Sequence, residues 1–115
     1  KRQHYDHEQA MEQIYRRVRE SAYQIIEEKG ATYYGVAMAV TRIAAALIRD
    51  EGAVLPVSSL MQGEYGLSDL CISVPAIVGD DGVRQVLEIP LNEKENKELR
   101  HSANGLKEIL QKIWL

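Results

Sequence analysis

The chain has 115 residues and a mass of 13.0 kDa, with 45% hydrophobic and 27% charged residues. These values are typical of one globular domain with enough apolar material for a sizeable core. The net charge of −3 offers no bulk positive field to nucleic acid or an anionic membrane, and a single cysteine, Cys71, excludes an internal disulfide framework. The longest clean apolar runs are too short to span a bilayer, which takes about 20 residues.

Two helices are predicted in the first half of the chain. Apolar residues recur at spacings of three and four from about Glu8 to Lys29, which indicates an amphipathic helix that Gly30 ends or bends. A second helix is predicted from about Thr32 to Asp50, and its apolar residues cover nearly the whole circumference. A helix that is apolar all round is a buried helix. The other elements are too few to enclose it, so we expect an upstream domain or a second subunit to cover part of it.

Three strands are predicted next, over residues 53–61, 70–79 and 82–91. The first two contain a proline, which favours an edge strand or an irregular one. Asp80-Asp81-Gly82 indicates a hairpin turn between the last two strands. Cys71 lies in an apolar, β-branched run, so a buried and inert thiol is expected.

The last element is a helix that begins after Asn92. Asn92 is a good N-cap residue, and Glu95 stands three residues further on, as in a capping box. The apolar stripe of this helix consists of Leu99, Ala103, Leu106, Leu110 and Ile113. The predicted fold is therefore α+β, with a long kinked helix pair, a small antiparallel sheet and a C-terminal helix.

Three stretches of the sequence resemble the C-terminal domain of bacterial L-lactate dehydrogenases, in the lactate/malate dehydrogenase family. They read RESAYQIIEEKGATYYGVAMAVTRI, VLPVSSLMQGEYGLSDLCISVPAIVGDDGV and LNEKENKELRHSANGLKEIL, and KGATYYG is a specific motif among them. The resemblance implies an enzyme that interconverts pyruvate and L-lactate by hydride transfer with NAD. Residues 1–115 would be most of its substrate domain, and its NAD-binding Rossmann half would lie outside this chain.

The same resemblance implies partners and a location. Family members are usually homotetramers, bacterial ones are often activated by fructose 1,6-bisphosphate, and we expect a cytoplasmic protein. The family's acid/base histidine, its orienting aspartate and its two substrate arginines match no residue of this chain. No catalytic residue is therefore assigned, and the chain alone is expected to be inactive.

Three residues match functional positions of the family. Thr32 matches the threonine that lines the substrate pocket, although helix capping is the plainer explanation from the sequence alone. Val36 lies one helical turn further on the same face and matches the aliphatic residue that packs against the nicotinamide ring, with core packing as an equal alternative. Tyr23 matches a tyrosine that is phosphorylated in some bacterial members, although an ordinary boundary position is the simpler explanation.

Two other functions stay open. One is a malate dehydrogenase of the same family; these enzymes tend to have alanine at the position of Thr32, so the threonine favours lactate. The other is a non-catalytic α+β module that binds a partner through the exposed side of the second helix.

Several other side chains are given plain structural roles. No metal site is predicted, because His4 and His7 are three residues apart without further ligands and His101 stands among polar residues. Tyr33 and Tyr34 are expected to be packing residues, with one side chain facing inward and the other partly exposed to solvent.

Overall fold

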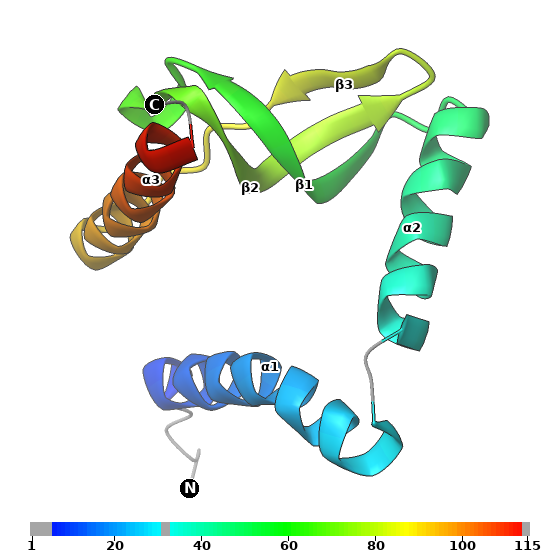
Figure 1. Ribbon diagram of the computed structural model, residues 1–115, viewed down its shortest axis with the longest axis vertical. Coiled ribbons are helices and arrows are strands. Elements are labelled where there is room, and N and C mark those ends of the chain that lie inside the picture. Colours follow the sequence, from blue (N-terminus) through cyan, green and yellow to red (C-terminus); the bar gives the residue numbers. More distant parts are fainter. Residues whose placement is uncertain (1–5, 31–32, 114–115) are drawn as a thin grey trace, which may run out of the picture. The chain divides into compact units, whose positions relative to one another are not determined.

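The computed structural model describes residues 6–30 and 33–113. Its elements, in chain order, are α1 (His7–Lys29), α2 (Tyr33–Ile48), β1 (Ala53–Gln62), the 3-10 turn η1 (Glu64–Gly66), β2 (Ser68–Gly79), β3 (Gly82–Val86) and α3 (Glu93–Ile113) (Figure 1). The chain divides into two compact units, residues 1–40 and 41–115. The predicted α+β order is confirmed. Within the described ranges, no helix is long and apolar enough to cross a membrane.

The helix α1 is capped at both ends. At its start the Asp6 Oδ1 atom accepts a hydrogen bond from the Gln9 backbone N–H, with an N···O distance of 3.4 Å. At its end Gly30 adopts a left-handed φ of 75°, and its N–H donates to the Ile26 carbonyl at 2.7 Å. Glycine takes this conformation without a steric penalty, so Gly30 ends α1 as a C-cap and the predicted break is confirmed.

The helix α2 is much less buried in this chain than its sequence predicted. Ala46 is its one buried residue, whereas Met38 is 70% exposed and Val40 is 59% exposed. A helix is buried only by its neighbours, and the side chains in the first half of α2 are exposed. The prediction of a buried helix is therefore wrong for this chain alone, while the expectation that these elements are too few to enclose α2 agrees with the exposure.

The sheet has the order β1-β2-β3, with both pairs antiparallel (Figure 1). Pro56 of β1 lies opposite Pro75 of β2. Proline has no N–H, so these residues occupy a pair that exchanges no hydrogen bonds, and the ring nitrogen of Pro56 faces the open edge of the sheet. The predicted edge position of the first strand is confirmed, and its proline hinders the addition of another strand.

The hairpin from β2 to β3 turns where the sequence predicted it. Gly79 pairs with Gly82, and Gly82 has a φ of 93°, which favours glycine. The prediction that the last strand continues to residue 91 is wrong, since β3 ends at Val86. The reason lies opposite, where Pro75 has no N–H with which to continue the ladder.

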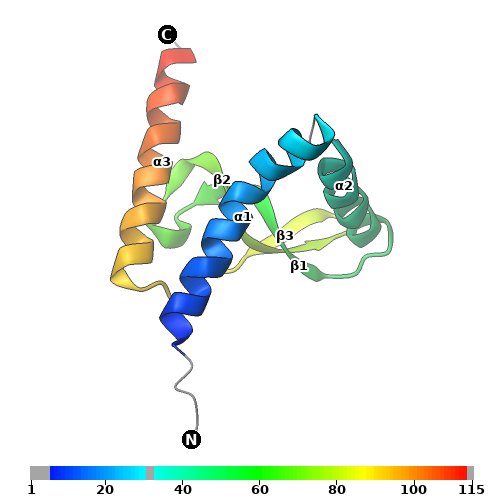
Figure 2. The same ribbon diagram turned by 90° about the horizontal axis from the view of Figure 1, so that it is seen from below.

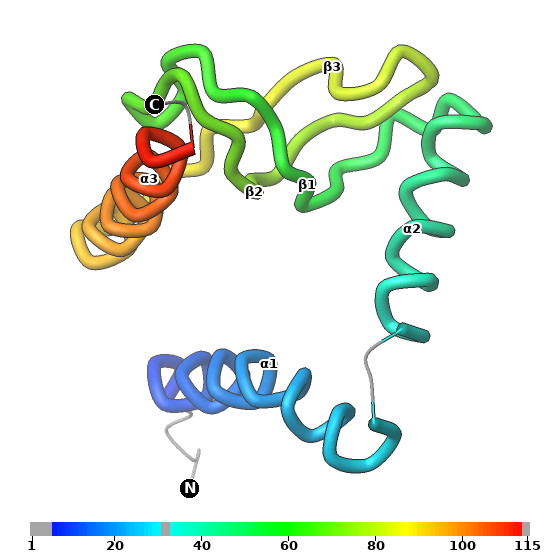
Figure 3. The backbone as a smooth tube through the Cα atoms, viewed as in Figure 1, coloured from blue at the N-terminus to red at the C-terminus, as the bar shows by residue number. Residues whose placement is uncertain are grey.

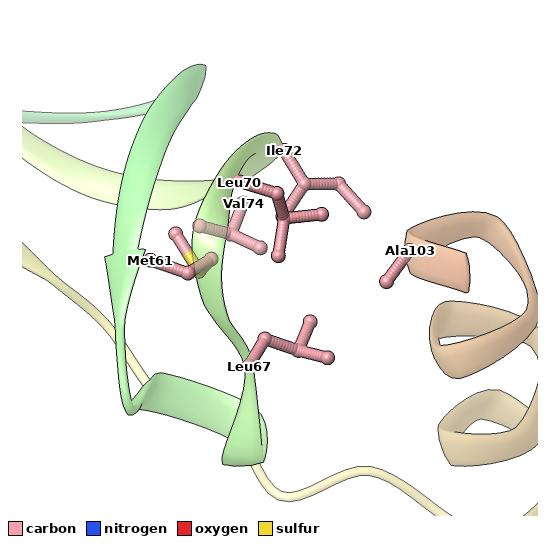
Figure 4. Close-up of a cluster of buried hydrophobic side chains, with 6 residues drawn as sticks. All are labelled: Met61, Leu67, Leu70, Ile72, Val74 and Ala103. Carbon is pink, nitrogen blue, oxygen red and sulfur yellow. The ribbon is translucent and has the colours of Figure 1, made fainter. Parts of the chain in front are cut away.

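The core lies where α3 packs against β2 (Figure 2). Met61 of β1 and Leu67, the residue after η1, add further side chains to it. Figure 4 shows Ala103 of α3 facing the strand side chains, and the buried cluster consists of Met61, Leu67, Leu70, Ile72, Val74 and Ala103. Successive side chains of a strand point to opposite faces, so Cys71 lies on the face opposite Leu70 and is exposed. The prediction of a buried thiol at Cys71 is therefore wrong.

Candidate functional site

The predicted site lies at the start of α2. Thr32, its proposed pocket residue, falls outside the described residues. Val36 lies one turn into α2 and is 60% exposed, so the alternative that it is a core residue of this chain is wrong. Tyr33 and Tyr34 are 79% and 76% exposed, which contradicts the prediction that one of them faces inward. The first turns of α2 thus present an apolar surface that this chain leaves uncovered.

This surface suits packing and not proton transfer. Residues 33–41 include no acidic, basic, histidine or cysteine side chain. They therefore offer no carboxylate, imidazole, thiol or amine for proton transfer, whereas their valine, methionine and tyrosine side chains can contact a flat apolar ring or another apolar surface. Lys29 at the end of α1 lies beside this surface, with its Nζ atom 5.7 Å from the centre of the Tyr34 ring.

Tyr23 and the described histidines lie at exposed positions. Tyr23 is 76% exposed on α1, so its hydroxyl is accessible in this chain. His101 is exposed on α3, His7 lies in the first turn of α1, and His4 falls outside the described residues. Within residues 6–30 and 33–113, no three His, Cys, Asp or Glu side chains are grouped so as to hold a metal ion.

One charged cluster was missed by the sequence analysis. Arg84 of β3 binds three carboxylates: its Nη2 atom donates to Asp50 and, at 3.0 Å, to Asp80, and its Nε atom donates to Asp81 at 2.7 Å. The Asp80 backbone N–H also donates to the Asp50 carboxylate, at 3.2 Å. The spacing of Asp80, Asp81 and Arg84 around a hairpin could have indicated part of this cluster, but Asp50 lies 30 residues from Asp80.

The cluster joins the turn after α2 to the β2–β3 hairpin. The guanidinium of Arg84 lies so close to Gly79 that a Cβ atom there would stand 2.4 Å from Cζ, so a larger residue at this position would displace the Arg84 side chain. The hydrogen bond donated by the Asp80 backbone and, to a smaller extent, the one donated by Arg84 lower the pKa of Asp50, and the carboxylates of Asp50 and Asp81 raise the pKa of Arg84. Because Nε and Nη2 are already engaged, this arginine is a structural link and not a clamp for an anionic substrate.

The chain is similar to known dehydrogenases over most of its length. Residues 1–114 match the family model described as lactate/malate dehydrogenase, alpha/beta C-terminal domain. An L-lactate dehydrogenase of Acetivibrio thermocellus is 53% identical over 100 residues, which are 87% of this chain and 32% of that relative. The chain therefore spans about a third of the length of the curated relatives it matches.

Solved structures give the same result. The minor L-lactate dehydrogenase of Enterococcus mundtii, in its ligands-bound form, has a TM-score of 0.88 and 38% identity, and the match covers 96% of this chain and 36% of that one. A malate dehydrogenase of Archaeoglobus fulgidus in complex with NADH has a TM-score of 0.78 and 38% identity, over 86% of this chain and 33% of that one. The fold, the element order and these matches agree. The chain belongs to the lactate/malate dehydrogenase family and corresponds to the alpha/beta C-terminal domain of its members.

Proposed function

We propose that the chain is the substrate domain of an NAD-dependent L-lactate dehydrogenase, which interconverts pyruvate and L-lactate. The observation that carries this proposal is the 53% identity to an L-lactate dehydrogenase over nearly the whole chain. A malate dehydrogenase of the same family is the second candidate, supported by the Archaeoglobus fulgidus structure. The alanine that is usual in malate dehydrogenases is replaced here by Thr32, which favours lactate.

The exposed residues of α2 fit a role beside the cofactor. NAD, when bound, accepts or delivers the hydride. Val36 is uncharged, apolar and 60% exposed, which suits packing against the nicotinamide ring. Thr32 stands four residues earlier, so on a continued helix its side chain would share the face of Val36. There its hydroxyl would line the substrate pocket, and its methyl group would limit the volume of that pocket.

The remaining functional groups are proposed to come from other parts of the enzyme. Proton transfer and the binding of the substrate carboxylate would belong to the NAD-binding half, since residues 33–41 include no acidic, basic or histidine side chain and Arg42 is paired with Glu51. We further propose a cytoplasmic homotetramer that is activated by fructose 1,6-bisphosphate. Tyr23 is the proposed site of tyrosine phosphorylation, and its 76% exposure leaves the hydroxyl open to a kinase.

Steady-state kinetics of the intact protein test the proposal. The value of kcat/KM with NADH is expected to be higher for pyruvate than for oxaloacetate. Thr32→Ala is expected to lower the ratio of the two kcat/KM values by about tenfold or more, because removal of a pocket methyl and hydroxyl changes discrimination by about 1–3 kcal/mol. Ser102→Ala, an exposed substitution on α3, is the matched control and is expected to leave the ratio unchanged.

The 115-residue chain, assayed in parallel, is expected to show no turnover, because it has no assigned acid/base group. A preference of the intact protein for oxaloacetate would instead favour malate dehydrogenase. Turnover by the chain alone would contradict the assignment of catalysis to the other half.

A further inference from the structure

The β2–β3 ladder ends at a proline, Pro75, which does not exchange hydrogen bonds with Pro56 of β1 but stands at a hydrogen-bonding position on the side of β3. The register of β2 and β3 pairs Ala76 with Val86, so Pro75 stands opposite Leu87. The Leu87 N–H donates to the Pro75 carbonyl at 2.9 Å. In an antiparallel ladder such a pair exchanges two hydrogen bonds, but Pro75 has no N–H to give in return. The Leu87 carbonyl is thereby left without its ladder donor.

A tyrosine hydroxyl supplies the missing hydrogen bond. The Tyr65 hydroxyl donates to the Leu87 carbonyl at 2.6 Å, and the same oxygen accepts a hydrogen bond from the Ile89 N–H at 2.9 Å. The ring of Tyr65 packs against the buried core cluster, which fixes the position of its hydroxyl. Its backbone φ of 55° is uncommon for a bulky side chain, so surrounding contacts must hold this conformation.

The consequence is a change in the direction of the chain. The Tyr65 hydroxyl, and not a residue of β2, donates to the Leu87 carbonyl, and it also accepts a hydrogen bond from the Ile89 N–H. Because these residues bond to Tyr65, β3 ends at Val86. The segment between β3 and α3 then leaves the sheet towards the start of α3 (Figure 3). We propose that the Tyr65 hydroxyl is a conformational clip that replaces the hydrogen bond Pro75 cannot make and so holds the β3–α3 connection in place. This inference does not depend on the proposed enzymatic activity.

Removal of the hydroxyl tests the clip. In the 115-residue chain, Tyr65→Phe is expected to lower the folding equilibrium constant by about tenfold, because the Leu87 carbonyl and the Ile89 N–H both lose a partner. Hydrogen exchange measured by NMR is expected to accelerate at the Ile89 amide more than at the Leu87 amide, which keeps its bond to Pro75. Tyr33→Phe removes a hydroxyl from a 79% exposed ring and is the matched control, with neither change expected.

A second substitution distinguishes the clip from general stabilisation. Pro75→Ala restores a backbone N–H opposite the Leu87 carbonyl, so it is expected to recover part of the stability lost in Tyr65→Phe. In the double variant Tyr65→Phe/Pro75→Ala, the amide of residue 75 is expected to be protected from exchange. The two effects are then non-additive in a double-mutant cycle.

Three results would overturn the proposal. They are additive effects of the two substitutions, an unprotected amide at residue 75 in the double variant, and an unprotected Ile89 amide in the unsubstituted chain. The last measurement needs no variant, so it decides the matter even if Tyr65→Phe does not fold.

Discussion

At the scale of single residues, the start of α3 shows how two side chains fix a helix boundary. The Asn92 side chain accepts a hydrogen bond from the Glu95 N–H at 2.8 Å, and the Glu95 carboxylate accepts one from the Asn92 N–H at 2.9 Å. These reciprocal bonds satisfy two backbone donors that a helix start leaves open. The capping box predicted from the sequence is thus confirmed, because its atoms lie within four consecutive residues.

Loss of this cap is expected to weaken α3. Asn92→Ala should lower the free energy of unfolding by about 1 kcal/mol, because the Glu95 N–H then lacks its acceptor. Urea denaturation followed by circular dichroism measures the change. Asn104→Ala, an exposed substitution within the same helix, should cause no loss, since alanine favours a helix interior. An equal loss in both variants would contradict the capping role.

At the scale of elements, Arg84 holds together two connections that are distant in the sequence. It joins Asp50, which follows α2, to Asp80 and Asp81 in the β2–β3 turn. The three carboxylates and one guanidinium form a network, and a network of this kind contributes more to stability than an isolated exposed pair. It is therefore expected to help hold the end of α2 against the hairpin.

This network makes stability depend on pH at the acidic end. The folded protein lowers the pKa of Asp50 below its unfolded value, so the contribution of Asp50 is present above about pH 4 and is lost as the pH falls through the folded pKa. Asp50→Asn is expected to reduce the loss of stability between about pH 4 and pH 2, as measured by urea midpoints across that range. Glu98→Gln on the exposed side of α3 is the control and should keep the wild-type slope. An unchanged slope in Asp50→Asn would contradict the link.

At the scale of the whole molecule, many large apolar side chains are exposed. Large apolar side chains of α1, of the first half of α2 and of the end of α3 are exposed, among them Ile14, Met38 and Ile113 at 56%, 70% and 68%. Exposed large apolar side chains, when grouped on a surface, usually mark interfaces. In a dehydrogenase, the NAD-binding half or another subunit is the proposed cover.

The 115-residue chain is therefore expected to self-associate in solution. Met38→Glu places a charge on the exposed apolar surface of α2 and should shift the chain towards monomer in sedimentation velocity. Ser102→Glu adds the same charge at an exposed position of α3 and should shift it less. A monomeric unsubstituted chain that binds no apolar dye would contradict this expectation.

Local patterns predicted most of the fold. The bounds of α1, the cap at Gly30, the turn at Asp80-Asp81-Gly82 and the capping box depend on residues close in sequence, so spacing and residue type were sufficient. The burial of Cys71, the inward position of one of Tyr33 and Tyr34, and the length of β3 were predicted wrongly. Each depends on which face or which opposing residue a position meets, and this information is not local.

The sequence by itself determined the element order, the helix caps and, through its resemblance to a known family, the expected substrate and cofactor. Only the tertiary structure decided the exposure of α2, the Arg84 network and the Tyr65 clip. The network brings together residues 30 and 34 positions apart, and the clip brings together residues 22 and 24 apart. Such contacts form when strands pair and a core closes, and hydrophobic periodicity records which face is buried but not which distant polar groups meet.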